Sequence, residues 1–388
     1  MERSRLESVD LVRGIVMILM ALDHVRDFLG VPGLNPVNIA QTTIPLFFTR
    51  WITHICAPTF FLLAGTGARL ALRRKSKGEV SRFLFTRGLW LIFLEEVILR
   101  LLAWQWNLDY RLTILNILWA LGWAMIVLAA LVWLPDWAIA TFACALIAGH
   151  NLFDSVSAQS LGRLAPLWTV LHEPGVLIPG RHLVFVAYPL VPWIAVIAAG
   201  YFLGLVYQWH PARRRGFLLS LGIALALAFV VLRAINGYGD PGRWHTQRSL
   251  AFTIVSFLNT TKYPPSLLFL LMTLSLTTLL LGLFDAVTPR LLRPVLVYGR
   301  VPLFYFALHA ALIHLIALGW CFVRYGQVHW MFESSSAGDF PITPPPGWGF
   351  SLPYLYLIWI LVVVALYPLC AWFARLKQRR SDAWLSYL

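Results

Sequence analysis

The sequence predicts an all-α integral membrane protein with about ten transmembrane helices in one bundle. Of its 388 residues, 59% are hydrophobic and only 12% are charged, and the mean hydropathy is +0.73. Apolar stretches of about twenty residues, long enough to cross a bilayer as a helix, recur along the chain. These observations exclude an ordinary soluble protein and favour a single transmembrane domain over residues 1–388.

Ten windows are expected to span the membrane. The first carries charged residues within its apolar sequence, and the fifth is short. The eighth follows Pro264 and Pro265, a pair that starts a helix, with polar residues before it as natural caps. In chain order the windows are 9–29, 45–71, 83–103, 112–133, 136–153, 183–207, 216–234, 265–284, 300–323 and 352–374.

The basic residues predict the orientation of the chain. Clusters at 73–82, 213–215 and 375–380 fall in segments expected on one side, whereas the opposite loops are longer and hold fewer basic residues. The positive-inside rule then places these clusters and both termini in the cytoplasm. The net charge of +14 is therefore assigned to orientation and not to nucleic-acid binding.

Charged side chains in the first window share one predicted face. At about 100° and 1.5 Å per residue, Arg13 and His24 lie about 20° apart around a helix and about 16 Å apart along it. Asp10 falls near the same stripe. Arg13 is therefore expected near the inner boundary of the membrane and His24 in its outer half.

This stripe suits a ligand with an anionic head and a long arm, such as a coenzyme A thioester. A guanidinium binds phosphate through paired charge-assisted hydrogen bonds, and an imidazole is suited to general-base catalysis at neutral pH. Arg13, with Asp10 beside it, is the predicted phosphate site, and His24 is the predicted base. The alternative is structural: Asp10 pairs with Arg13, and residues 23–27 form a solvated helix end.

The first helix resembles integral-membrane O-acyltransferases of the acyltransferase-3 type, in which ten residues separate an arginine from a histidine. Here Arg13 follows Asp10, and His24 follows Asp23. Further segments, ordered along nearly the whole chain, resemble the bacterial branch of the heparan-alpha-glucosaminide N-acetyltransferase catalytic-domain family. They are residues 51–58, 87–95, 256–266 and 299–304.

The resemblance implies a multi-pass enzyme of the bacterial inner membrane that moves an acyl group, typically acetyl, from cytoplasmic acyl-CoA to an extracytoplasmic acceptor. The expected acceptor is a sugar hydroxyl or amine of an envelope glycan or glycolipid. Lysosomal members have a catalytic histidine in the loop after the first helix, but residues 30–44 contain none. His24 therefore takes its place in our prediction, with Asp23 or Glu95 as its orienting partner.

Arginines and carboxylates in other windows are candidates for the same site. Arg69, Arg87 and Arg300 lie toward the inner ends of their windows, where they either join the phosphate site or extend to lipid headgroups. Glu95 and its neighbour Glu96 are candidates for orienting His24 or relaying protons. Their structural alternative is an intrahelical ion pair, favoured by the i,i+4 spacing of residues 96 and 100.

Four residues of the predicted outer half are candidates for binding the acceptor. They are His54, Lys262, Tyr263 and His309. The alternative for each histidine is a hydrogen-bonded packing role, and for residues 262 and 263 it is a capped helix start. No metal site is predicted, because the remaining histidines lack ligand spacing, and the four cysteines are interpreted as apolar packing residues.

Two other functions remain compatible with the sequence. In a transporter or flippase, buried charges would form a pathway, and substrate would move without consumption of thioester. In a silent scaffold, replacement of His24 would change nothing. The sequence leaves open whether the chain associates with copies of itself.

Overall fold

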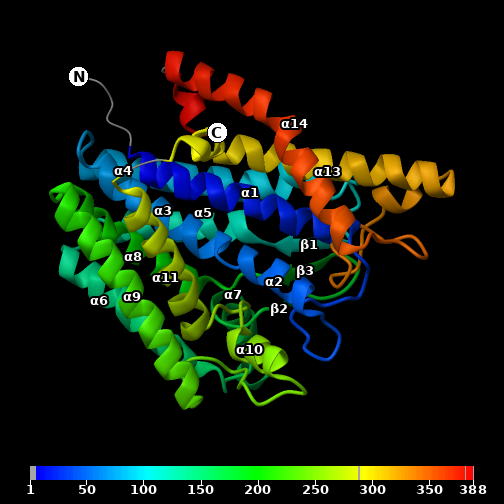
Figure 1. Cartoon of the computed structure of the whole chain (residues 1–388), viewed down its shortest axis with the longest axis horizontal. Coiled ribbons are helices and arrows are strands. Elements are labelled where there is room, and N and C mark those ends of the chain that lie inside the picture. Colours follow the sequence, from blue (N-terminus) through cyan, green and yellow to red (C-terminus); the bar gives the residue numbers. More distant parts are fainter. Residues whose placement is uncertain (1–5, 287–288, 381, 388) are drawn as a thin grey trace.

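The computed structural model describes residues 6–286, 289–380 and 382–387 and shows a mostly helical chain (Figure 1). The α-helices are α1 (Glu7–Leu29), α2 (Ile44–Thr53), α3 (Cys56–Ala71), α4 (Lys77–Phe93), α5 (Ile117–Leu131), α6 (Asp136–Gly149), α7 (Ala165–Leu171), α8 (Leu190–Leu203), α9 (Pro211–Ile235), α10 (Leu250–Leu258), α11 (Leu267–Phe284), α12 (Val295–Arg300), α13 (Pro302–Tyr325) and α14 (Leu352–Arg379). The strands are β1 (Leu112–Leu115), β2 (Gly175–Ile178) and β3 (Leu183–Val186). A π-helix, η1 (Leu94–Trp104), extends α4, and the 3₁₀ helices are η2 (His150–Phe153), η3 (Ala158–Leu164), η4 (Gly204–Gln208), η5 (Arg290–Leu292), η6 (His329–Phe332) and η7 (Ala383–Ser386).

Within the described residues, six helical segments are long and apolar enough to cross a membrane, or seven if one sharply bent pair forms a single span. The six are Ile44–Ala71, Leu190–Gln208, Pro211–Ile235, Leu267–Phe284, Pro302–Tyr325 and Leu352–Arg379, and each matches a predicted window. The first window forms one 23-residue helix, α1, which is rich in charged side chains. The chain is a helical membrane protein, and the count of ten spans stays a prediction.

The prediction of a purely helical fold is wrong in one region. Residues 112–115 and 183–186, which we placed inside spans, form parallel strands β1 and β3, and β2 pairs antiparallel with β3. Both segments are short apolar runs, which periodicity alone cannot assign to helix or strand. The start of the eighth span also differs, because α11 begins after the proline pair and Ser266, not a polar residue before the prolines, caps it by accepting a hydrogen bond from Phe269 N.

Glycines bring several helix pairs into close contact. A Cβ atom at Gly299 of α12 would lie 1.8 Å from the Asp10 carbonyl oxygen of α1, and one at Gly14 would lie 2.2 Å from Val295 O. The absence of side chains at these two positions lets the helix backbones approach directly, as small residues do in membrane bundles. This contact holds the α12–α13 corner beside the charged face of α1.

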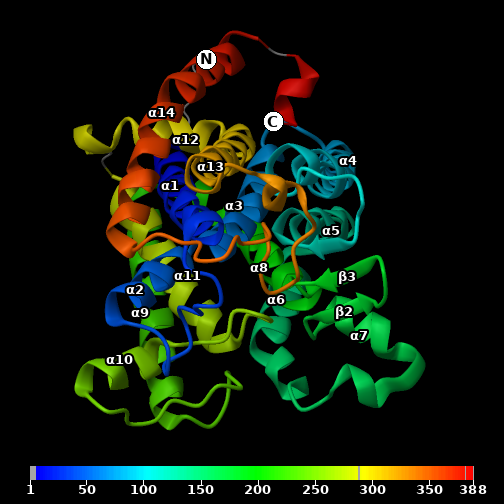
Figure 2. The same ribbon diagram turned by 90° about the vertical axis from the view of Figure 1, so that its right-hand side faces the viewer.

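Helix α1 occupies the centre of the bundle, packed against α2, α3, α11, α12, α13 and α14 (Figures 1 and 2). Its apolar side chains, including Val12, Val16, Leu22 and Phe28, are fully or almost fully buried. A charged helix in this position faces protein and cavities on most of its circumference. Such a placement is typical of functional charges in membrane proteins.

The two ends of the described chain lie on one side of the molecule. In both ribbon views the start of α1 and the end of α14 lie toward the top, whereas α7, α10 and strand β2 lie toward the bottom (Figures 1 and 2). Helix η7 also packs beside α4, where the Trp90 indole donates a hydrogen bond to Tyr387 O. The cytoplasmic placement of both termini stays a prediction.

Candidate functional site

Two cavities lie end to end along α1. The inner cavity, about 420 Å³, reaches from Arg13 to Met20, and the outer cavity, about 410 Å³, reaches from Met20 past His24 to Lys262. Met20, Ile117 and Phe306 line both cavities. The stripe predicted on α1 therefore faces two adjacent cavities, with Arg13 on one and His24 on the other.

Basic side chains line the inner cavity, which is otherwise largely apolar. They are Arg13, Arg87, Arg300 and Lys377. Arg13 Nη1 donates to the Gly299 carbonyl oxygen at 3.1 Å and to Asp10 Oδ1 at 3.3 Å, and Arg300 Nε lies 4.0 Å from Asp10 Oδ2. Asp10 thus lies beside two of the arginines, and its pair with Arg13 is the contact that the structural alternative expected. Among the described residues that line this cavity, four are basic, and such a set would attract an anionic ligand.

The structure places Arg69 away from this cluster. Its guanidinium makes a bidentate ion pair with Asp136, at 2.6 Å and 2.9 Å, in a separate cleft that Arg73 and Lys77 also line. Of the residues predicted for the phosphate site, Arg13, Arg87 and Arg300 line the inner cavity, whereas Asp10 and Arg69 do not. It ties α3 to the start of α6.

His24 is joined to a second histidine. Its Nδ1 lies 2.7 Å from His309 Nε2, and the two ring planes differ by only 11°, as an in-plane hydrogen bond requires. His309 Nδ1 lies 2.7 Å from the Tyr305 carbonyl oxygen, which accepts hydrogen bonds only, so this nitrogen carries the proton. In the neutral ring Nε2 is then an acceptor, and His24 Nδ1 must donate to it. His24 Nε2 is left with its lone pair, which is the form a general base needs.

Aromatic rings fix the orientation of this pair. The Trp104 ring, at the end of η1, meets His24 edge to face with 4.9 Å between ring centroids, and Phe306 meets it at 5.7 Å. His309 is fully buried, and its ring centroid lies 4.8 Å from that of Tyr305. His24 is partly exposed and lines the outer cavity. The buried histidine therefore holds the exposed one in a single orientation.

Asp23, a predicted orienter of His24, is engaged elsewhere. Its carboxylate pairs with Arg26 at 2.8 Å and with the Arg50 guanidinium from α2. Arg26 also pairs with Asp27 at 2.6 Å. These four residues form a charge-balanced cluster at the wall of the outer cavity, which all four line. Any influence of Asp23 on the histidine acts through this cluster.

Glu95 is buried on η1, and its Oε2 accepts a hydrogen bond of 2.6 Å from Trp119 N. With Glu96 it lines a small cavity of about 20 Å³ that shares Trp104 with the outer cavity. Glu95 is thus separated from the outer cavity by Trp104, and within the described part of the chain no hydrogen bond joins Glu95 to His24 or His309.

The prediction of an ion pair between Glu96 and Arg100 is wrong. Arg100 instead donates to Asn107 Oδ1 and to the Leu112 carbonyl oxygen, and it lies over the Tyr110 ring at 4.0 Å. The reason is local winding: this segment is a π-helix, whose i→i+5 hydrogen bonds shift the i,i+4 neighbours out of the alignment assumed for an α-helix.

Lys262 and Tyr263 line the outer cavity, opposite α1. The Lys262 ammonium lies 5.1 Å from the Tyr263 ring centroid, and the Tyr263 hydroxyl lies 3.4 Å from that of Tyr188. Burial raises the pKa of the Tyr263 phenol, but the charges of Lys262 and Arg50 outweigh it, and the net shift is downward. The two predicted residues thus provide an ammonium and a hydroxyl facing the same space as His24.

His54 does not join the cavity. It lies in the break between α2 and α3, where it is 2% exposed and its ring lies 5.4 Å from that of Phe269. Thr53 and Cys56, on either side of it, line the outer cavity instead. Among the described residues no group of three or more His, Cys, Asp or Glu side chains is placed to hold a metal ion. All four cysteines are free, and Cys144 alone of them is exposed.

Four residues of the site were missed by reading the sequence. Arg50, Lys377 and Tyr188 were not singled out, and His309 was assigned to acceptor binding and not to His24. Arg50 lies near the start of the predicted apolar window 45–71, and a charge inside such a window was the signal available. No signal in the sequence pairs residues 24 and 309, which are brought together only by the crossing of α1 and α13.

Comparison with known proteins gives the family. No curated protein compared with the chain matches it significantly. The family model described as heparan-alpha-glucosaminide N-acetyltransferase, catalytic, matches residues 5–234, which is more than half of the chain and includes α1, η1 and both of their cavity-lining faces. The chain therefore belongs to the heparan-alpha-glucosaminide N-acetyltransferase catalytic-domain family.

Proposed function

We propose that this protein is a membrane acyltransferase that moves an acetyl group from acyl-CoA, bound through the inner cavity, to an acceptor in the outer cavity. Membership in an N-acetyltransferase family supports a transferase that uses acetyl-CoA. The observation that carries the proposal is the junction of the two cavities at Met20, Ile117 and Phe306. One cavity is rich in cations and the other holds His24.

The inner cavity fits the shape of acyl-CoA. Arg13, Arg87, Arg300 and Lys377 supply positive charge for the phosphates, and the largely apolar walls accept the long pantetheine arm. His24 lies about 16 Å along α1 from Arg13, by helix geometry, so the arm must extend past Met20 for its thioester to reach the imidazole. A compact anionic metabolite would not need this length.

His24 then acts as the general base. The acceptor amine or hydroxyl attacks the thioester carbonyl carbon and forms the new C–N or C–O bond, while His24 Nε2 takes the acceptor's proton. The C–S bond breaks, and the imidazolium returns the proton to the leaving thiolate, so that free CoA thiol and acetylated acceptor are the products. His309 keeps His24 in the required tautomer throughout.

The acceptor enters from the opposite side. Lys262, Tyr263 and the Asp23 cluster line the outer cavity and offer hydrogen bonds to sugar hydroxyl groups. A sugar amine or hydroxyl of an envelope glycan or glycolipid matches this polar lining. The proposed location is the bacterial inner membrane. The basic inner cavity faces the cytoplasm in this proposal, because acyl-CoA is made in the cytoplasm.

Transport of a substrate without acyl chemistry is the rival function. The two functions are distinguished with purified protein in nanodiscs, to which acetyl-CoA and glucosamine are added. Release of CoA thiol reports the reaction, and calorimetry reports the binding of acetyl-CoA. We expect binding and thiol release by wild type, weak binding by Arg13→Gln, and binding without thiol release by His24→Ala. Arg293→Gln, which removes an exposed arginine outside both cavities, is the matched control and should behave as wild type.

The proposal fails if folded wild-type protein has no affinity for acetyl-CoA, or if His24→Ala releases thiol at the wild-type rate. Transport would then be favoured by movement of a ligand across proteoliposomes at constant thioester concentration.

A further inference from the structure

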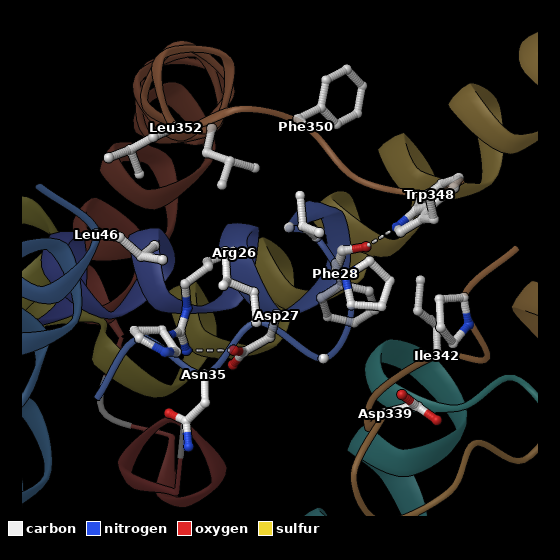
Figure 3. Close-up of a pocket in the computed structure, with 18 of the residues that line it drawn as sticks. Arg26, Asp27, Phe28, Asn35, Leu46, Asp339, Ile342, Trp348, Phe350 and Leu352 are labelled. Atoms are coloured by element: carbon white, nitrogen blue, oxygen red, sulfur yellow. Dashed lines mark hydrogen bonds and ion pairs between the residues drawn. The ribbon is translucent and has the colours of Figure 1, made fainter. Parts of the chain in front are cut away.

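A third cavity opens beside the outer cavity. This side pocket, about 470 Å³, lies between the end of α1, the following loop, the start of α2 and the segment that leads into α14. Arg26, Asp27 and Phe340 line both the side pocket and the outer cavity, so the two spaces meet at the Arg26–Asp27 ion pair. Figure 3 shows this pair between Leu46 and Leu352 on one side and Ile342 and Trp348 on the other.

The walls of the side pocket are held in place by the backbone of α1. The Trp348 indole donates a hydrogen bond of 3.0 Å to the Phe28 carbonyl oxygen, and Phe350 N donates one of 2.8 Å to Leu29 O. Gly349 has φ +119° and lies so close to Val31 that a Cβ there would be 2.7 Å from Val31 Cα. The loop before α14 is therefore fixed against α1.

The pocket lining combines apolar and polar groups. Aliphatic and aromatic side chains line it, among them Phe28, Leu34, Leu46, Ile342, Leu352 and Leu355. Two polar side chains of the lining are engaged within the chain: Asn35 Oδ1 accepts from Val37 N, and Asp339 Oδ2 accepts from Ser336 Oγ at 2.7 Å.

The charges of the pocket exclude a polyanionic occupant. Its charged lining residues are one arginine and two aspartates, Arg26, Asp27 and Asp339, and the arginine is already paired with Asp23 and Asp27. A sulfated glycan chain would meet net negative charge here. An uncharged hydrocarbon chain would meet no such barrier.

The pocket also lies beside exposed apolar side chains. Val31 and Leu34 on its rim are 51% and 38% exposed, and Phe48 and Ile52 continue the exposed apolar surface along α2. A molecule with its chain in the surrounding lipid could thus place part of that chain in the pocket while its head group lies in the outer cavity.

We infer that the acceptor is a lipid-linked sugar, whose hydrocarbon chain binds the side pocket while its sugar lies against His24. This inference rests on the proposed function and narrows it, because the polar cavity alone would also accept a free glycan. The hydrophobic contact is made by the ground state and the transition state alike, so it lowers KM for the acceptor more than it raises kcat.

The test compares two acceptors that differ only in the chain, glucosamine and its octyl glycoside, with the protein in nanodiscs and acetyl-CoA in excess. Wild type should show an acceptor KM at least about tenfold lower for the octyl glycoside, because each buried methylene contributes several-fold to affinity. Leu34→Trp, which fills the pocket from an exposed rim position, should abolish most of this difference without changing KM for glucosamine. Val31→Glu provides a second pocket variant.

Partitioning of the octyl glycoside into the lipid would by itself lower the apparent KM for this acceptor. A matched control variant separates this effect from binding in the side pocket. Leu357→Trp makes the same kind of substitution on an exposed face of α14 outside the pocket and should keep the wild-type difference. Equal KM values for the two acceptors in wild type, or a difference that survives both pocket variants, would overturn the inference. Absence of thiol release with either acceptor would instead overturn the proposed function.

Discussion

Replacement of His309 tests the tautomer argument without touching either cavity. His309 lines neither of them, but it is the acceptor for His24 Nδ1 and is itself fixed by Tyr305 O. His309→Phe keeps an aromatic ring and removes the acceptor. His24 then has no partner that selects the tautomer with a lone pair on Nε2.

The size of the effect follows from one lost hydrogen bond. A buried donor left without its acceptor costs about 1–3 kcal/mol, which corresponds to a fall of about 5- to 150-fold in the population of the productive ring orientation. We therefore expect kcat of His309→Phe to fall by about 10- to 100-fold. His24→Ala, which removes the base itself, should lose about 10²–10⁴-fold. KM for acetyl-CoA should be unchanged in both.

Steady-state kinetics of thiol release in nanodiscs measures both constants. His309→Gln restores an acceptor oxygen and should recover part of kcat. His314→Gln is the matched control: this histidine lies on the same helix, is equally buried and bonds to Ala103 O and Met331 O away from His24, so its loss should lower stability and leave kcat unchanged. A wild-type kcat in His309→Phe, or an effect confined to KM for acetyl-CoA, would refute the tautomer argument.

Three further predictions concern the path of the donor. Met20→Trp, at the junction of the cavities, should reduce kcat by about 10²-fold through misplacement of the thioester, while calorimetry still detects binding of acetyl-CoA. Gly299→Leu forces α12 away from Asp10 and should cost about 1–3 kcal/mol, seen as a lower Tm in detergent; an unchanged Tm would contradict the close contact. Asp136→Asn breaks a partly exposed ion pair, should cost at most about 1 kcal/mol and should leave the Kd for acetyl-CoA unchanged, whereas a weaker Kd would place Arg69 in the donor site.

Features that depend on a single helix could be predicted from the sequence. The stripe of Arg13 and His24 follows from helix geometry alone, and both side chains line the cavities as expected. Six of the ten windows are long apolar helices for the same reason, since twenty apolar residues have few alternatives in a bilayer.

Features that depend on two segments could not be predicted from the sequence. The partner of His24 is 285 residues away, and the partner of Asp23 from α2 depends on where α2 crosses α1. The sheet of β1, β2 and β3 was missed because its short apolar strands resemble the ends of spans. Glu96 and Arg100 were paired by α-helical spacing, but the segment is wound as a π-helix.

The central claim is that donor and acceptor reach His24 from opposite sides of the membrane. Proteoliposomes test it directly, with acetyl-CoA added outside and a membrane-impermeant amino sugar placed either inside or outside. We predict acetylated sugar inside the vesicles and free CoA thiol outside, with little product when both reactants share the outer solution. Product formed only when donor and acceptor share one compartment would contradict the account.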